Sequence, residues 1–237
     1  MKSKVLILGN GLLGTELKNQ SDWDIVSREV DGFDITDTDT YYLMTEIFHG
    51  VAQAMPYDVI INCIANTDTY SNDKEAHWNV NYKGTADLVD FCNKWNVKLI
   101  HISTDYVYAN SDNLASENSV PVHCNNWYGY TKLLSDGHVQ LTCNDYMLIR
   151  CTHKPTPFQY EEAWIDQVGN FDYVNNIAKI ITTLINKNCT GVYNIGTDLK
   201  TMYELGCETK EDVTPSLRPT HVPCNLSMDL TKMKKVL

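Results

Sequence analysis

The chain has 237 residues, of which 43% are hydrophobic, and a formal net charge of −11. This length allows one large domain, or one domain with a small addition. The acidic balance disfavours non-specific nucleic-acid binding, which needs Lys and Arg clusters that displace counterions. No run of ~18 apolar residues predicts a membrane span. The apolar stretch before the first glycine turn is too short for a secretory signal. We therefore predict a cytoplasmic protein without nucleic-acid or membrane partners.

The eight cysteines favour the same compartment. None of them forms a CxxC pair, and several lie inside apolar runs. This pattern indicates reduced and mostly buried thiols, with neither a metal site nor a disulfide. The cysteines are Cys63, Cys92, Cys124, Cys143, Cys151, Cys189, Cys207 and Cys224.

Up to residue 150, apolar strand-like runs alternate with helical stretches. The predicted strands are 5–8, 24–26, 59–64, 99–103 and 146–150. The predicted helices are one that begins near residue 12, then 41–51, 79–95 and 128–140. The run 59–64 is apolar on both faces, which is typical of a covered parallel strand. The alternation predicts an α/β fold with a Rossmann-like, doubly wound parallel sheet.

Beyond residue 150 the pattern is looser. A proline-containing loop is followed by a helical apolar stripe over 174–188, a short strand over 191–196, a proline-broken tail over 215–225 and a final helix over 228–237. We predict a small C-terminal part over 151–237, some of whose helices and strands also pack on the core formed by 1–150.

Three glycines follow the first strand. Gly9, Gly11 and Gly14 have the spacing GxGxxG and stand between a strand and a helix. In this context the glycines allow a tight turn, a close approach of a pyrophosphate and close helix–strand packing, while the helix N-terminus faces the phosphates. The alternative is a purely structural turn, because the motif alone is a weak signal.

The end of the second strand bears on the choice between NADPH and NADH. Ser27 and Arg28 favour the 2′-phosphate of NADPH, whereas the adjacent Glu29 favours the free hydroxyl of NADH. The interpretation of Arg28 as a surface residue is nearly as well supported. Asp34 and Ile35 follow and are candidates for contact with the adenine edge.

Polar side chains end the strand 99–103 and return in the next predicted helix. Tyr128 and Lys132 are four residues apart and so share one helix face. An ammonium lowers the pKa of a nearby phenol, which then passes a proton to a ketone as hydride reaches its carbon. Thr104, at the end of the neighbouring strand, is placed to hold the same oxygen, since ligands bind beyond the carboxyl ends of parallel strands. A surface Tyr–Lys pair is the alternative.

The sequence resembles the extended short-chain dehydrogenase/reductase family and, more narrowly, the dTDP-4-dehydrorhamnose reductases. The resemblance spans nearly the whole chain and rests on "LILGNGLLGTEL", "FDITD", "DVIINCIANT", "NVNYKGT", "LIHISTDYVY", "YGYTK", "MLIR", "GVYNIG" and "PSLRPTHVPCNLSMDLTKM". It implies reduction of the 4-keto group of a nucleotide-linked 4-keto-6-deoxy sugar by NADPH or NADH. The default substrate is dTDP-4-keto-rhamnose, with the UDP sugar second.

The resemblance also implies roles for particular residues and regions. Residues 1–150 would bind NAD(P), and 151–237 would bind substrate. A homodimer would form through the helices 79–95 and 128–140. Asn81 would be part of the scaffold. The implied catalytic residues are Thr104, Tyr128 and Lys132. The implied cofactor contacts are Gly9, Gly11, Leu12, Leu13, Gly14, Ser27, Arg28, Asp34, Ile35, Ala65, Thr67, Tyr128 and Lys132. The implied substrate contacts are Thr67, Thr104, Asp105, Tyr106, His153 and Arg218.

The sequence also departs from this family. Its glycine turn is one residue shorter than the usual GxxGxxG, the segment before Tyr128 is longer, and His153 stands where a tryptophan is frequent. The chain is shorter between about 155 and 210, a region that normally builds part of the sugar-nucleotide pocket. Two other functions therefore stay open: a bifunctional epimerase/reductase, and a non-catalytic subunit similar to the regulatory subunit of methionine adenosyltransferase. His153 and Arg218 are also compatible with plain loop or surface positions.

Overall fold

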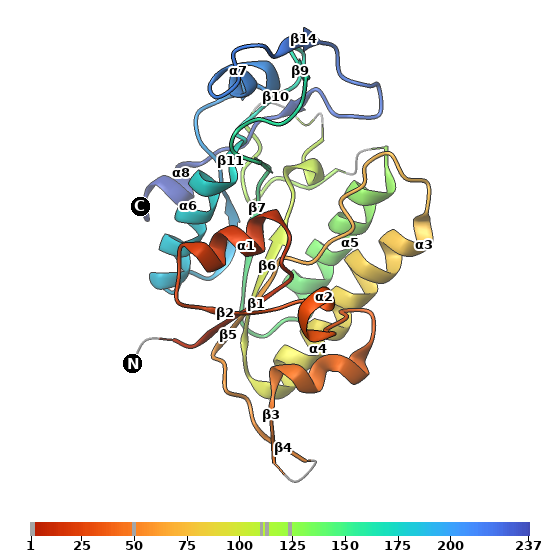
Figure 1. The fold of residues 1–237 in the computed structure, drawn as a ribbon, viewed down its shortest axis with the longest axis vertical. Coiled ribbons are helices and arrows are strands. Elements are labelled where there is room, and N and C mark those ends of the chain that lie inside the picture. Colours follow the sequence, from red (N-terminus) through yellow and green to blue (C-terminus); the bar gives the residue numbers. More distant parts are fainter. Residues whose placement is uncertain (1–2, 49–50, 110, 112–113, 123–124) are drawn as a thin grey trace.

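A six-stranded parallel sheet forms the centre of the protein (Figure 1). The computed structural model describes residues 3–48, 51–109, 111, 114–122 and 125–237. Along the sheet the strands are β12 (Gly191–Asn194), β7 (Tyr146–Arg150), β6 (Lys98–Ser103), β5 (Val59–Asn62), β1 (Val5–Leu8) and β2 (Asp24–Val26). The chain leaves β1 towards β2 and returns on the other side with β5. A topological switch point, where open α/β sheets bind ligands, therefore lies between β1 and β5.

Helices cover both faces of the sheet. Strand side chains point alternately to either side, and here both sides are apolar and must be buried. On one face Ile7 and Ile61 pack with α1 (Leu12–Asn19) and α6 (Val174–Asn186). On the other face Leu6 and Ile60 pack with α4 (Gly84–Trp95) and α5 (Trp127–Thr142). Figure 1 shows the two helix pairs on opposite sides of the strands. Burial on both faces explains why the central strands lack an apolar–polar alternation.

The predicted strands 5–8, 24–26 and 146–150 are confirmed with these bounds. The predicted helix 79–95 consists of a π-helical turn, η2 (Trp78–Lys83), that continues into α4. The other short helices of the first part are α2 (Arg28–Asp31), α3 (Lys74–His77) and the 3-10 turn η3 (Asp105–Val107).

The predicted helix over 41–51 is wrong. A 3-10 helix, η1 (Thr38–Met44), covers its beginning, and two antiparallel strands follow, β3 (Glu46–Phe48) and β4 (Val51–Ala54). The buried residues of η1, Tyr41 and Met44, are three apart, which is the period of a 3-10 turn. Aromatic and β-branched residues such as Phe48 and Val51 favour strands over helices. Residues 49 and 50 lie outside the described residues.

Residues after β7 serve both the sheet and a separate cluster. β12 and α6 belong to the central layers, and Lys232 of α8 (Thr231–Lys234) donates to the Val192 carbonyl at 2.6 Å. A second cluster of buried hydrophobic residues packs around Phe158, Phe171 and Leu205, of which Leu205 belongs to α7 (Met202–Cys207). This part of the chain lies at the top of Figure 1. Its short strands are β8 (His153–Lys154), β9 (Glu162–Trp164), β10 (Val168–Gly169), β11 (Asp172–Tyr173), β13 (Lys200–Thr201), β14 (Thr214–Ser216) and β15 (Asn225–Leu226).

Two further sequence expectations concern thiols and membranes. The seven cysteines in the described ranges are free; Cys92, Cys143 and Cys151 are buried, whereas Cys207 is exposed. Cys124 lies outside the described residues. Within the part of the chain that the structure describes, no helix is both long and apolar enough to cross a membrane.

Candidate active site

A cavity of about 600 Å³ lies beyond the carboxyl ends of the central strands. Its floor is formed by Gly11–Leu13 at the start of α1, by residues after β5 and by the end of β6. One wall comes from α5, and the opposite wall from residues that follow β7. This wall includes Phe158, Tyr160 and Trp164. The position agrees with the switch point of the sheet.

The glycine turn is built so that only glycine fits at two of its positions. Gly9 has a φ of 95°, and its N–H donates to the Val26 carbonyl at 2.8 Å. A Cβ on Gly14 would lie 1.9 Å from the Gly9 carbonyl oxygen, so α1 can approach β1 this closely only without a side chain. Gly9 and Gly14 thus shape the turn from behind, while Gly11, Leu12 and Leu13 line the cavity.

The first turn of α1 points towards the cavity without a counter-charge of its own. Its N-cap residue, Gly11, makes no side-chain capping bond, and no acidic residue stands in the first turn. The orphan N–H groups and the positive end of the helix dipole are therefore suited to an anion. The residues present fit the diphosphate of a dinucleotide at this point.

Thr104 stands where β6 ends, and neighbouring polar groups hold it there. Its hydroxyl accepts from the Tyr106 N–H at 3.2 Å and donates to Asp105 Oδ1 at 3.3 Å, while Thr152 donates to the same oxygen at 2.6 Å. Thr104 and Tyr106 line the cavity. Asp105 is fully buried behind them and is absent from the cavity lining. This position differs from the prediction that Asp105 faces the sugar, because its carboxylate is turned to the two threonines.

Burial raises the pKa of Asp105 to about 6. The hydrogen bonds from Thr152 and Thr104, together with the charge of Lys154, act against this rise. Asp105 Oδ2 is buried without a hydrogen-bond partner among the described residues. The carboxyl group is therefore a buried support for Thr104 that favours the protonated form more than an exposed aspartate does.

Tyr128 and Lys132 come from the first turns of α5. Asn126 caps this helix by accepting from the Gly129 N–H at 2.7 Å. Both Tyr128 and Lys132 line the cavity together with Thr104, as the sequence pattern predicted. The ring of Tyr128 meets the ring of Tyr106 edge to face, with centroids 5.8 Å apart.

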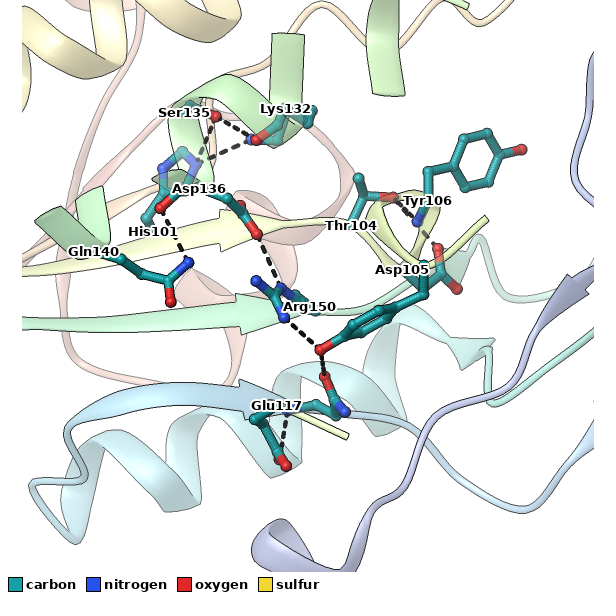
Figure 2. Close-up of polar contacts among 12 residues, drawn as sticks. His101, Thr104, Asp105, Tyr106, Glu117, Lys132, Ser135, Asp136, Gln140 and Arg150 are labelled. Atoms are coloured by element: carbon teal, nitrogen blue, oxygen red, sulfur yellow. Dashed lines mark hydrogen bonds and ion pairs between the residues drawn. The ribbon is translucent and has the colours of Figure 1, made fainter. Parts of the chain in front are cut away.

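Lys132 is almost completely buried and is tied to β6 (Figure 2). Its Nζ donates to the Ile102 carbonyl at 2.8 Å and lies 3.2 Å from His101 Nε2. Burial lowers the pKa of Lys132 to about 8, against the opposing charge of Asp136. An ammonium in this position is more easily deprotonated than an exposed one. It lines the same cavity as the Tyr128 side chain.

Behind Lys132, a buried polar network joins α5 to the last two strands of the sheet (Figure 2). Arg150 Nε lies 2.9 Å from Asp136 Oδ2, and each side chain is only 1% exposed. Arg150 also donates to Tyr108 Oη, which in turn donates to Asn194 Oδ1 at 3.1 Å. The network fixes α5 relative to the strand ends that carry the site.

The predicted contacts on the ribose and adenine side lie outside this cavity. Ser27 is buried and caps α2 by accepting from the Val30 N–H at 3.3 Å. Arg28 is 79% exposed, and its Nε lies 3.2 Å from Asp34 Oδ2. Ile35 is buried in the core. Arg28 and Asp34 thus form a partly exposed ion pair near the end of β2, whereas the Ile35 carbonyl accepts from Tyr41 Oη at 3.0 Å inside the core.

The remaining predicted contacts divide into two groups. Ala65, Thr67 and His153 line the cavity, and burial lowers the pKa of His153 to about 4. Arg218 lies outside the lining. Its Nε is 3.6 Å from Asp166, and its Nη1 donates to the carbonyls of Pro219 and Val222. Arg218 is therefore held by Asp166 and by carbonyls of its own loop.

Sequence reasoning missed two polar residues that the fold brings to the site. His101 is fully buried in β6, with Nδ1 3.4 Å from Asn62 Nδ2 and Nε2 facing Lys132. Lys154 lines the cavity from β8. A charged or titratable residue inside an otherwise apolar strand was the available signal for His101. For Lys154 the surrounding loop gave no pattern.

Comparison with known proteins agrees with this architecture. Residues 3–153 match the family described as the RmlD substrate binding domain. This chain belongs to that family. Over 191 residues, 76% of the chain, it is 28% identical to a dTDP-4-dehydrorhamnose reductase of Mycolicibacterium smegmatis, of which it covers 51%. The chain thus spans about half the length of the curated relatives it matches.

Solved structures of similar proteins share the RmlD-family fold along nearly the whole chain. One is a dTDP-4-dehydrorhamnose reductase of Bacillus anthracis in complex with NADP, with a TM-score of 0.81, 22% identity and coverage of 99% of this chain and 93% of that chain. Another is the reductase of Yersinia enterocolitica, with a TM-score of 0.79, 19% identity and coverage of 99% and 92%. At these identities the likeness establishes the fold.

Proposed function

We propose that this RmlD-family chain is an NADPH-dependent reductase, able to use NADH as a second cofactor, of the 4-keto group of a nucleotide-linked 4-keto-6-deoxy sugar. The observation that carries the proposal is that the start of α1 and the side chains of Thr104, Tyr128 and Lys132 line the same cavity. The names of the relatives support it, since a similar protein is a dTDP-4-dehydrorhamnose reductase and a structural neighbour holds NADP.

The chain offers separate groups for each part of the cofactor. The N–H groups at Gly11–Leu13 would hold the diphosphate, and Lys132 the nicotinamide ribose. Arg28, at the exposed end of β2, would meet a 2′-phosphate once it releases Asp34. Ala65 and Thr67 would border the nicotinamide. When bound, NADPH supplies the hydride.

The reduction also needs a proton for the ketone oxygen. Tyr128 would donate it, because its phenol lines the cavity on the same helix face as Lys132. The Lys132 ammonium stabilises the phenolate left behind. Thr104, whose hydroxyl donates to Asp105 at 3.3 Å in this structure, would turn its hydrogen to the sugar oxygen and hold it. Tyr106 and His153 would face the sugar.

Several finer features belong to this proposal. Residues 1–150 would form the NADPH-binding domain, and 151–237 the smaller substrate-binding part that returns β12 and α6 to the core. The nucleotide would be dTDP or UDP. We further propose a cytoplasmic homodimer that pairs through α4 and α5, which lie side by side on one face of the sheet (Figure 1).

The test is consumption of NADPH, followed by its absorbance, with dTDP- and UDP-linked 4-keto-6-deoxy sugars. Wild type should turn over one of them, and Tyr128→Phe should lower kcat by about 10²- to 10⁴-fold. Tyr42→Phe is the matched control, since Tyr42 is exposed on η1 and outside the cavity lining. Equal turnover by Tyr128→Phe and wild type would contradict the mechanism. Tight NADPH binding without turnover of any such sugar would favour a non-catalytic binding subunit.

A further inference from the structure

A second lysine lies in the wall of the cavity without a counter-charge. Lys154 ends β8, and its partly accessible side chain lines the same cavity as Lys132. Among the described residues, no hydrogen bond or ion pair within 4.0 Å reaches its ammonium nitrogen. The contact found for Nζ is with the ring of Tyr160, whose centroid is 5.4 Å away.

The groups that face Lys154 do not neutralise it. Asp105 is the carboxylate whose charge it feels, but Oδ1 of Asp105 is already bonded to Thr104 and Thr152. Two acidic residues of the cavity lining, Asp68 and Glu162, are exposed and form no ion pair with Lys154. Burial lowers the pKa of Lys154, and the charge of Asp105 only partly offsets this effect.

A partly buried ammonium without an anionic partner is costly, because it loses part of its hydration and gains no counter-charge in return. A bound ligand that carries negative charge replaces that hydration. The neighbouring His153 supports the same conclusion, since its Nδ1 is buried and has no hydrogen-bond partner among the described residues. The cavity therefore holds polar groups that its own walls leave unsatisfied.

The position of Lys154 relative to the reaction follows from Asp105. Thr104 and Thr152 converge on one oxygen of this carboxylate, at 3.3 and 2.6 Å. Lys154 follows Thr152 by two residues and interacts with the same carboxylate. The charge of Lys154 thus acts on the carboxylate that supports Thr104, while its ammonium lies over the ring of Tyr160 in the aromatic wall of the same cavity.

We propose that Lys154 is a specificity-determining residue that binds an oxyanion of the substrate. This inference rests on the proposed function, because it assigns a contact for the substrate of that site. Phosphate and carboxylate oxygens have the same relevant chemistry: each accepts charge-assisted hydrogen bonds from an ammonium. The oxyanion belongs either to the diphosphate that links nucleotide and sugar or to a carboxylate on the sugar ring.

Isothermal titration calorimetry on the full chain, with NADPH present, separates the two sources. The probes are UDP, dTDP, UDP-glucose and UDP-glucuronate, of which the last two differ by a carboxylate. If the diphosphate is the ligand, Lys154→Met weakens all four by about 10- to 100-fold. If a sugar carboxylate is the ligand, wild type prefers UDP-glucuronate to UDP-glucose by about tenfold or more, and Lys154→Met removes only this preference.

The controls distinguish a local loss of charge from a damaged fold. Lys154→Arg keeps the charge and should bind within about threefold of wild type. Lys179→Met removes an exposed lysine of α6 and should bind as wild type does. NADPH affinity should be equal in all variants. Should Lys154→Met not fold, Lys154→Gln takes its place.

Two results would overturn the inference: equal affinity of wild type and Lys154→Met for every probe, or no binding of any probe by wild type. The proposed function fails separately. If no 4-keto sugar is reduced but Lys154→Met still weakens nucleotide binding, the reductase assignment is wrong and the oxyanion site stands. If a sugar is reduced at the same kcat and KM by both proteins, the oxyanion site is wrong and the reductase assignment stands.

Discussion

The two walls of the cavity are held by different means. The wall that carries Tyr128 and Lys132 is anchored by long elements of the central layers and by the buried pair of Asp136 and Arg150. The opposite wall consists of strands of two or three residues packed on a small cluster around Phe158. Under the proposed function, the reaction chemistry would stand on a rigid scaffold, and substrate choice on a wall that can change without altering the sheet.

The largest expected effect comes from breaking the anchored wall. Arg150→Met leaves Asp136 as a buried, unpaired charge, which should cost about 3–5 kcal/mol of unfolding free energy. Urea denaturation followed by circular dichroism measures this loss. Lys83→Met, which removes an exposed i,i+4 pair with Asp87, should change the stability by less than about 0.5 kcal/mol. Similar losses for both variants would show that the network does not anchor α5.

Asp105, the buried carboxyl that supports Thr104, should make the free energy of unfolding depend on pH. The carboxyl of Asp105 has a folded pKa of about 6, against an ordinary value of 3.8. The folded state therefore binds this proton more tightly, and its stabilising effect is lost as pH rises from about 4 to 7. The stability of wild type relative to Asp105→Asn should fall by about 3 kcal/mol over this range. A pH-independent difference in the urea midpoints would contradict the burial argument.

The glycine turn should tolerate no side chain at Gly14. The added methyl of Gly14→Ala would meet the Gly9 carbonyl and push α1 away from β1, at a cost of about 2–3 kcal/mol. NADPH affinity should fall as well, and fluorescence titration measures it. Gly137→Ala on α5 is the control, because its Cβ meets nothing within 4 Å and should stabilise the helix slightly. If Gly14→Ala binds NADPH as tightly as wild type, the glycine turn does not contribute to cofactor binding.

The smallest expected effect lies at the edge of the cofactor site. Arg28→Leu breaks an exposed ion pair, so the stability should change by less than about 1 kcal/mol. The ratio of kcat/KM for NADPH to that for NADH should nevertheless drop about tenfold, since the cation beside a 2′-phosphate is removed. A constant ratio would place cofactor choice elsewhere.

The parts of the fold that the sequence predicts are those governed by local patterns. The apolar strand 5–8, the glycines that follow it and the Tyr128–Lys132 spacing are short-range signals. The structure places Gly11, Tyr128 and Lys132 in the lining of one cavity. The prediction of a helix over 41–51 was wrong because the apolar residues of this stretch belong to a 3-10 helix and two short strands. His101 and Lys154 were missed since their importance depends on what other strands bring near them. Arg218 was predicted to reach the substrate but is held by Asp166.

The most direct test of the central claim is a crystal structure of Tyr128→Phe with NADPH and a 4-keto-6-deoxy nucleotide sugar. This variant should retain both ligands because it lacks the proton donor. The account predicts the diphosphate of NADPH at the start of α1 and the sugar ketone within hydrogen-bond distance of Thr104 Oγ1. Ligands bound outside this cavity, or a sugar turned away from Thr104 and residue 128, would contradict it.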